Sequence, residues 1–407
     1  MNEMNNTNAV NPFADRERCP HNEFCGGCLY QGMPYEEQCR QKGREVLLRM
    51  QEKKVDLSHL EVPFTEELLI PAPKQYAYRN KMEYTFGDFV KDGEMSLGMH
   101  KKGNFMSIIT VDQCQIVDPD FNQILSATLE FCRKRNYSFY HKKSHRGLMR
   151  HLIVRKGERT GEILVNIVTS SQDEFAEEAY AECIYNLPLQ NTPVGVLRTI
   201  NDGLADTVSA DEVRILRGRD YYMEKIMGLD FKVSAFSFFQ TNVEAAERLY
   251  QDALALLPDF SGKVAYDLFC GTGTITQALA TKAQKAVGVE IIEEAVTAAR
   301  ENAARNGLHN CEFIADDVFR ALDQLPEKPD VLVVDPPRAG LLPKTLDKIL
   351  QYEVDEILYI SCNPKTLAEN MKYMEYFGYR AVKMLAYDNF PMTKHIESVI
   401  LLTKVHK

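Results

Sequence analysis

A cysteine stands where the sequence predicts a junction between a strand and a helix, in the stretch "YISCNPKTLAEN" at residues 359–370. A thiolate at such a junction can act as a nucleophile, although a small buried residue at a turn would also explain Cys362. Two carboxylates stand at comparable positions, since Asp335 closes the apolar run of "VVDPPRAG" and Glu397 precedes that of "HIESVILLT". A thiolate and a carboxylate together can add to an electron-poor carbon and later remove a proton from it.

The last part of the chain predicts the elements that position these side chains. From about residue 231, short apolar strands alternate with amphipathic helices, which is typical of a parallel sheet covered by helices on both faces. In such sheets, ligands bind beyond the carboxyl ends of the strands. We therefore expect Asp335 and Cys362 at one edge of the sheet.

A cofactor site is indicated by "DLFCGTGTITQALA" at residues 267–280, which predicts a strand, a glycine turn and the start of a helix. Gly271 and Gly273 allow the backbone to approach a ligand closely. Glu290 ends the next strand and is placed to bind ribose hydroxyls, and Asp317, after a further strand, can reach an adenine amino group. The set is typical of S-adenosylmethionine-dependent methyltransferases, and another nucleoside-binding fold is the alternative.

A methyltransferase sheet has seven strands and ends with an antiparallel strand, which begins at the edge where the parallel strands finish. Asp335, Cys362 and Glu397 would therefore converge near the methyl donor. Pyrimidine C5 is a poor nucleophile, but a thiolate that adds to C6 raises the electron density at C5, and a base must then remove the C5 proton. Cys362 suits the first role and Glu397 the second. Arg338 stands where enzymes that methylate amino groups often have an aromatic residue, which argues against that reaction.

Six motifs, matched in order, carry a resemblance to the RNA uracil-5-methyltransferase family: "AFSFFQTN" (235–242), "DLFCGTGT", "GVE", "DPPRAG", "SCNP" and "HIES". The family forms 5-methyluridine in ribosomal RNA and in tRNA. The resemblance implies Cys362 as nucleophile and Glu397 as base. It also implies that four residues contact the methyl donor: Gln240, Phe269, Glu290 and Asp335.

The N-terminal stretch "CPHNEFCGGC" contains Cys19, Cys25 and Cys28. Three thiolates need a fourth ligand to complete a metal site, and Cys39 and Cys114 are the candidates. The resemblance implies Cys114 and a 4Fe–4S cluster, as in the members that modify ribosomal RNA, while structural zinc is the alternative. Because the tRNA members generally lack these cysteines, 23S rRNA is the expected partner and tRNA the alternative. A β-barrel RNA-binding domain found in many members is expected to be absent, since 18 residues precede Cys19.

A basic segment at residues 133–159 contains ten Lys or Arg residues and one acid, with Tyr137, Phe139 and Tyr140 among them. Cations neutralise phosphates and aromatic rings stack on unpaired bases, so the segment predicts RNA binding, with a solvated basic surface as the alternative. A non-enzymatic RNA-binding or ribosome-assembly factor is the competing class of function. A pure binding protein, however, would need neither Cys362 nor Glu397.

The 407 residues, of which 45% are hydrophobic, have a net charge of −10 and include ten cysteines. No apolar run is long enough to span a membrane, and the polar N-terminus lacks a signal peptide, so we expect a cytoplasmic monomer. The expected fold class is α/β, with a disordered lead-in at 1–18 and an iron–sulfur region with a helix at 19–75. A mostly antiparallel RNA-binding β domain is expected at 76–230, and a Rossmann-like methyltransferase domain at 231–407.

Overall fold

The computed structural model describes residues 18–205, 210–325 and 327–405, so the expected lead-in lies outside the described residues except for Arg18. The chain forms two compact units. The central unit consists of the chain up to Gly32 together with Lys74–Glu224, and the C-terminal unit combines Met33–Pro73 with Lys225–Lys407. The expected region 19–75 is thus divided after Gly32, because the helix that follows packs with the C-terminal unit.

The central unit is built on a seven-stranded sheet in the order β3-β2-β1-β4-β5-β6-β7. Neighbouring strands are antiparallel except β5 and β6, which are parallel and are connected through α3 (Glu177–Tyr185). The other helix of the unit, α2 (Pro119–Lys134), begins after Asp118, whose side chain accepts a hydrogen bond from the backbone N–H of Asp120. The strands are β1 (Lys81–Asp88), β2 (Met95–Lys101), β3 (Asn104–Thr110), β4 (Met149–Lys156), β5 (Glu162–Thr169), β6 (Thr192–Ile200) and β7 (Glu212–Gly218).

The C-terminal unit contains a second seven-stranded sheet, in the order β12-β11-β10-β13-β14-β16-β15. The strand β16 pairs antiparallel with both of its neighbours, whereas β10 to β14 pair parallel, which confirms the expected Rossmann-like methyltransferase topology. The strands are β10 (Val264–Leu268), β11 (Lys285–Glu290), β12 (Cys311–Ala315), β13 (Val331–Val334), β14 (Glu356–Ser361), β15 (Tyr379–Tyr387) and β16 (Glu397–Lys404). A separate two-stranded sheet is formed by β8 (Tyr221–Ile226) and β9 (Leu229–Ser234).

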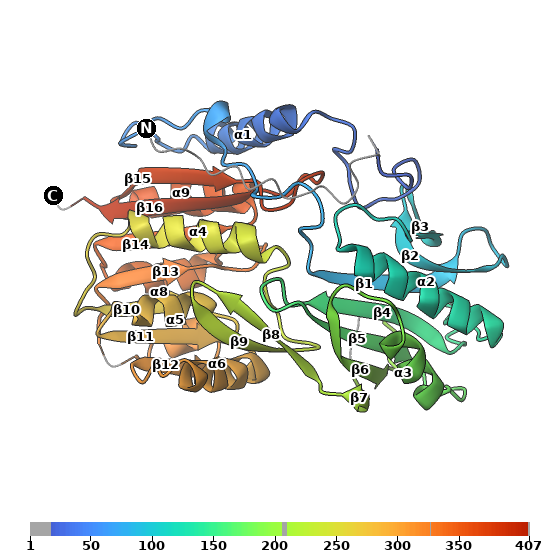
Figure 1. The fold of residues 1–407 in the computed structure, drawn as a ribbon. Helices are drawn as coiled ribbons and strands as arrows, with labels where there is room; N and C mark the ends of the chain where they lie inside the picture. The colour runs from blue at the N-terminus through green and yellow to red at the C-terminus, as the bar shows by residue number, and fades with distance from the viewer. Residues whose placement is uncertain (1–17, 206–209, 326, 406–407) are drawn as a thin grey trace. The chain divides into compact units, whose positions relative to one another are not determined.

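Helices cover both faces of this second sheet (Figure 1). On one face lie α4 (Val243–Leu256), α5 (Thr274–Ala280) and α6 (Glu293–Arg305), and on the other lie α7 (Val318–Ala321), α8 (Pro343–Gln351) and α9 (Pro364–Tyr376). The helix α1 (Tyr35–Glu52) packs against α9, although the two are far apart in the sequence, and the short 3₁₀ helix η1 (Glu66–Leu68) follows it. Val46 and Met50 bury the apolar face of α1 in the same core as α8 and α9.

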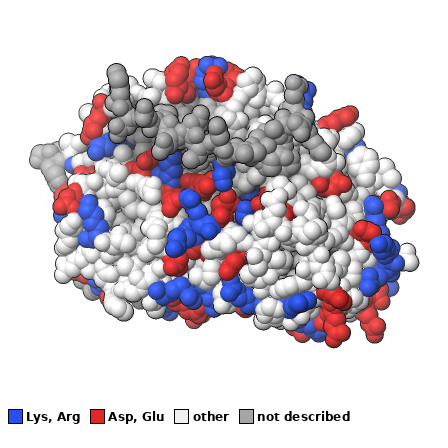
Figure 2. All heavy atoms as spheres, in the orientation of Figure 1, with Lys and Arg blue, Asp and Glu red and all other residues white. Residues whose placement is uncertain are grey.

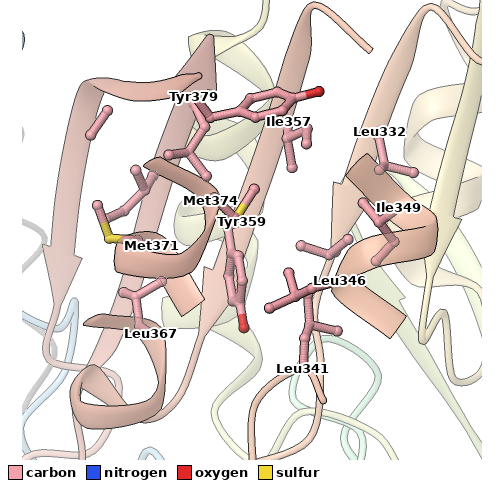
Figure 3. Close-up of a cluster of buried hydrophobic side chains, with 14 of the residues drawn as sticks. Leu332, Leu341, Leu346, Ile349, Ile357, Tyr359, Leu367, Met371, Met374 and Tyr379 are labelled. Atoms are coloured by element: carbon pink, nitrogen blue, oxygen red, sulfur yellow. The ribbon is translucent and has the colours of Figure 1, made fainter. Parts of the chain in front are cut away.

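Buried apolar side chains surround Tyr359 of β14 (Figure 3). The Tyr359 ring lies near Leu341, Leu346 and Leu367, and its hydroxyl donates to the side-chain carbonyl of Asn370 over 2.7 Å. Since a buried tyrosine hydroxyl needs a partner, this hydrogen bond fixes the ring. The Tyr359 side chain is thus anchored three residues before Cys362, within β14.

The surface charge is mixed, and on the face shown in Figure 2 Lys and Arg side chains are interspersed with Asp and Glu. Among the described residues, no helix has the length and apolar character needed to cross a membrane.

Candidate active site

The glycine turn after β10 has the backbone geometry of a ligand-binding loop. Gly271 and Gly273 have φ angles of 53° and 79°, and Phe269, at 71°, is also left-handed. A Cβ at Gly273 would lie 2.7 Å from the Phe313 ring, so packing requires glycine there. A Cβ at Gly271 would meet no atom within 4 Å, which leaves open space beside the backbone where a ligand can approach.

The acids that end β11 and follow β12 are held by backbone N–H groups. The Glu290 carboxylate accepts hydrogen bonds from Gly271 over 3.2 Å and from Ile292 over 3.0 Å, so it lies at the glycine turn as predicted. Asp317 accepts from the backbone N–H of Phe319 over 2.9 Å and caps α7. One oxygen of Asp317 therefore already has a structural role.

Gln240, a predicted contact of the methyl donor, lies in the loop before α4. Its side-chain amide donates to the Tyr250 hydroxyl over 2.8 Å. Tyr250 is buried, and burial followed by the charge of Asp335 raises its pKa well above the usual value. Tyr250 thus interacts with both Gln240 and Asp335. The sequence did not indicate this role, because Tyr250 occupies an ordinary apolar position of α4.

Two carboxylates lie at the carboxyl ends of β10 and β13, and that of Asp267 is fully buried. Burial, with a contribution from the negative charge of Asp267, raises the pKa of Asp335 to about 7. Burial likewise raises the pKa of Asp267 to about 7, while the hydroxyl of Thr276 donates to it over 2.6 Å and stabilises the charged form. Asp267 was also missed, although a carboxylate at the end of the apolar run "VAYDL" was a usable signal.

Cys362 and Glu397 come together at the end of the paired strands β14 and β16. Ser361 pairs with Ser398, so the residue after β14 and the first residue of β16 lie at the same edge of the sheet, as the sequence predicted. Burial raises the pKa of Cys362 to about 11, and the charge of Glu397 contributes to this increase. Burial raises the pKa of Glu397 to about 8, with a contribution from Asp335.

The positive charge of Arg338 has the opposite effect and limits the increase in the pKa of both Cys362 and Glu397. A hydrogen bond holds the loop that contains Arg338. The side-chain amide of Asn363 donates to the backbone carbonyl of Arg338 over 2.9 Å. A thiol, two carboxylates and a guanidinium thus lie within electrostatic reach of one another at the edge of the sheet.

Comparisons with known proteins identify the family to which this arrangement belongs. Residues 208–405 match the sequence model of the tRNA (uracil-5-)-methyltransferases. An uncharacterized RNA methyltransferase from Clostridium tetani is 45% identical over 393 residues, which cover 97% of this chain and 85% of the relative. The chain belongs to the RNA (uracil-5-)-methyltransferase family. Another uncharacterized RNA methyltransferase of this kind, from Caldanaerobacter subterraneus, is 45% identical over 97% of this chain and 86% of its own length.

Among solved structures, the chain is similar to the tRNA (uracil-54, C5)-methyltransferase of Pyrococcus abyssi in complex with S-adenosyl-L-homocysteine. The TM-score is 0.77 at 25% identity, over 93% of this chain and 85% of that protein. The similarity therefore extends through both units rather than the methyltransferase sheet alone. As a member of the family, the protein is an RNA methyltransferase.

The N-terminal cysteines of this family member are brought into one neighbourhood of the central unit. His21 accepts a hydrogen bond from the backbone N–H of Gln113 over 3.1 Å, which holds the segment with Cys19, Cys25 and Cys28 beside the segment with Cys114. After burial, the charge of Cys114 is the largest influence that raises the pKa of Cys28. Burial also raises the pKa of Cys114 to about 12, with contributions from Cys19 and Cys25.

Within residues 18–205, 210–325 and 327–405, no three His, Cys, Asp or Glu side chains have ligand atoms arranged to hold a metal ion. The four thiols nevertheless match a four-thiolate ligand set in type and number, and a backbone N–H of Gly27 donates to the Cys25 sulfur over 3.4 Å. Cys39 belongs to the other unit, in α1, where it packs against the apolar core.

The expected RNA-binding role of the basic segment is wrong for two of its residues, Arg150 and Tyr140, which are buried. Arg150 is 3% exposed and donates to the carbonyl oxygens of Asn201, Gly203 and Ala205, so it stabilises a loop instead of contacting phosphates. Arg133 donates to the Met95 carbonyl, and Tyr140 is buried beneath the Arg150 guanidinium. Lys143 and Arg146 are exposed on the turn between Tyr140 and Arg150, so they remain candidates for contacts with RNA phosphates.

Proposed function

We propose that this protein methylates C5 of a uridine in RNA through a covalent bond between Cys362 and C6 of the base. The observation that carries the proposal is the convergence of Cys362 and Glu397 at the edge of the sheet, beside Asp335. A binding protein would have no use for a thiol and a carboxylate in this arrangement. The competing function of a non-enzymatic assembly factor is not supported, because the chain belongs to a family of methyltransferases.

The reaction begins when the Cys362 thiol loses its proton to water and the sulfur adds to C6 of the uracil ring. The C5–C6 double bond becomes an enolate, so C5 gains electron density and accepts a methyl group. Glu397 then takes the proton that C5 still holds, the double bond forms again, and the Cys362 thiolate leaves. A base with a pKa of about 8 suits this step, because a carboxylate with a raised pKa binds a proton more strongly.

The residues that would hold S-adenosylmethionine are those around the glycine turn and the adjacent strand ends: Gln240, Phe269, Gly271, Glu290, Asp317 and Asp335. Open space beside Gly271 and the fixed Glu290 carboxylate match the needs of a nucleoside with ribose hydroxyls. When bound, S-adenosylmethionine supplies an electrophilic methyl group. The base itself must be turned out of its stack to reach Cys362.

We also propose that Cys19, Cys25, Cys28 and Cys114 hold a 4Fe–4S cluster. The mutual influence of the four thiols on their pKa values supports a shared site, and the N–H donor at Cys25 is of the kind that stabilises cluster sulfur. Structural zinc is the alternative, since four thiolates also suit tetrahedral zinc. When bound, the metal centre would tie the two cysteine-containing segments of the central unit together.

We propose a uridine in 23S rRNA as the substrate, and the protein as a monomer. The cysteine set favours ribosomal RNA over tRNA within the family. The second candidate is tRNA, which is favoured by the similarity to the tRNA (uracil-54, C5)-methyltransferase of Pyrococcus abyssi. Mass mapping of 23S rRNA and tRNA from a strain that lacks the gene separates the two, because 5-methyluridine should disappear from one of them.

The covalent mechanism is tested with RNA that contains uridine labelled with tritium at C5. The unaltered enzyme should release tritium as methyl groups are added, and Cys362→Ala should release none. Glu397→Gln should form the bond to C6 without completing the reaction, so a protein–RNA adduct should accumulate on denaturing gels. Methylation by Cys362→Ala would overturn the proposal. RNA with 5-fluorouridine serves as the control for adduct formation, because fluorine cannot leave as a cation.

A further inference from the structure

The loop at residues 388–396 connects β15 to β16. It leads directly to Glu397, the proposed base, which is the first residue of β16. The beginning of this loop is attached to α1 by an ion pair between Lys42 and Asp388. The Lys42 ammonium lies 2.6 Å from the Asp388 carboxylate, and both side chains are fully buried. Lys42 also donates to the backbone carbonyl of Phe390 over 3.2 Å, while the N–H of Phe390 donates to Asp388 over 3.0 Å.

A second side chain of α1 holds the middle of the same loop. Gln38 is fully buried and lies one helical turn before Lys42, on the same face of α1. Its side-chain oxygen accepts a hydrogen bond from the backbone N–H of Met392 over 2.9 Å, and its amide donates to the Met33 carbonyl over 2.8 Å. Lys42 and Gln38 thus contact the loop at two successive points.

The loop is also attached to the segment that contains Gln240. The Asn242 amide donates to the backbone carbonyl of Asn389 over 2.7 Å, and the Asn242 oxygen accepts from the N–H of Ala245 at the start of α4. Asn242 is 3% exposed, so this hydrogen bond is shielded from water. The loop is therefore held by α1 on one side and by the start of α4 on the other.

The path of the chain toward Glu397 is determined by three side chains that contact backbone atoms of residues 389–392: Lys42, Gln38 and Asn242. A buried ion pair is a weak source of stability, because well-packed apolar side chains of similar volume often serve as well or better. Apolar replacements, however, cannot donate to the Phe390 carbonyl or accept from the Phe390 N–H. What the pair adds over an apolar contact is directional bonding to the backbone of this loop.

We propose that Lys42 and Gln38 are positioning residues that hold the loop at 388–396 so that the Glu397 carboxylate meets the C5 proton. The inference rests on the proposed function of Glu397 as the base. A helix located more than 300 positions earlier in the sequence thereby takes part in the removal of the C5 proton.

The test uses the double variant Lys42→Met/Asp388→Leu, which removes both buried charges together and so avoids leaving one unpaired. Gln38→Leu is the second variant. Lys53→Met, which breaks the exposed pair with Glu369 at the end of α1, is the matched control. Three quantities are measured in the full-length protein: tritium release from uridine-labelled RNA, the rate of adduct formation with 5-fluorouridine RNA, and the affinity for S-adenosylhomocysteine.

We expect tritium release to fall by about ten- to a hundredfold in both test variants, since a displacement of roughly 1 Å costs about a hundredfold in rate. The adduct with ordinary uridine RNA should accumulate, as in Glu397→Gln, while 5-fluorouridine adduct formation and S-adenosylhomocysteine affinity stay within about threefold of the unaltered enzyme. Lys53→Met should leave all three quantities unchanged. This separation identifies a loss at proton removal rather than a general loss of structure.

Unchanged tritium release in both test variants would overturn the positioning role, and so would an equal loss in tritium release and 5-fluorouridine adduct formation. Glu397→Gln is assayed alongside to separate the two proposals. If Glu397→Gln accumulates the adduct and the test variants do not, the positioning role alone is wrong. If Glu397→Gln forms no adduct, the proposed base is wrong and the positioning role fails with it.

Discussion

After burial, the negative charge of Glu397 is the largest influence that raises the pKa of the Cys362 thiol. The two groups share the same sheet edge because Ser361 and Ser398 pair across β14 and β16. A thiolate beside a charged carboxylate is unfavourable, so Cys362 loses its proton more easily while Glu397 is neutral. With a pKa of about 8, Glu397 is mostly neutral at pH 7, and its charged form is needed only after the methyl group has been added.

Cys362→Ala should abolish methyl transfer and leave binding of S-adenosylhomocysteine within about threefold of the unaltered protein. The reason is that the proposed donor contacts, such as Gln240 and Glu290, lie on other elements. Activity loss of at least about a hundredfold is expected for removal of a nucleophile. Isothermal titration calorimetry and a methylation assay measure the two quantities. Cys311→Ala, in β12 of the same sheet, is the control and should keep its activity.

The rate of proton removal should rise with pH up to about 8 and then level off, because Glu397 must be ionised to accept the C5 proton. Below pH 8 the rate should increase about tenfold per pH unit. Single-turnover tritium release between pH 6 and 9 measures this profile. A rate that does not change over this range would contradict the assignment of Glu397 as the base.

Glu397→Gln should make the protein more stable at pH 8.5 but not at pH 5. Burial raises the pKa of Glu397 from its ordinary value of 4.5, so the folded protein binds this proton more tightly than the unfolded chain. The unfolding free energy therefore falls as the pH rises from about 4.5 through 8. Glutamine stays neutral and avoids a cost of about 1–2 kcal/mol, allowing for partial exposure of the site. Thermal denaturation at the two pH values measures the difference.

The sheet of the C-terminal unit was predictable because each buried strand is a short apolar run with a helix after it. The apolar runs "KAVGVE" and "EILYIS" form β11 and β14, and "SVILLT" forms most of β16. The convergence of Cys362 and Glu397 followed from topology, since an antiparallel last strand begins where its parallel neighbours end. Motif position was therefore sufficient to place these two side chains at one edge of the sheet.

Replacing Cys114 with Ser should remove the metal centre, whereas Cys39→Ser should keep it. Cys114 lies in the same unit as the three N-terminal cysteines and influences the pKa of Cys28, while Cys39 packs in the apolar core of the other unit. Protein purified without oxygen should contain about four irons per chain and be brown. Metal analysis and visible absorption measure this. Stoichiometric zinc in a colourless protein would contradict the cluster.

Lys143→Ala/Arg146→Ala should weaken RNA binding and reduce its salt dependence by roughly one to two units of log–log slope, since each phosphate contact releases about one counterion. Lys134→Ala is the control, because Lys134 is exposed but pairs with Glu130 one helical turn away. Binding titrations at several salt concentrations measure the slope. An unchanged slope in the double variant would mean that this turn does not contact RNA.

Residues that act through tertiary contacts could not be predicted from the sequence. In the sequence Arg150 is one of many cations of a basic segment, yet it is buried, and its two terminal guanidinium nitrogens donate to three loop carbonyls. No motif singles out Lys42 and Gln38, and their partners become neighbours only when the chain is folded. Local patterns predict strands and turns, whereas the partner of a buried polar group depends on the whole fold.

The ion pair between Lys42 and Asp388 joins residues 346 positions apart, which determines when the C-terminal unit can form during synthesis. A ribosome adds about 5–20 residues per second, so Asp388 is synthesised roughly 20–70 s after Lys42. Lys74–Glu224 is complete long before then, so most of the central unit can fold first. Until α9 and the last strands appear, the apolar face of α1 lacks the core in which it is buried, and this early helix is the segment that chaperones would need to shield.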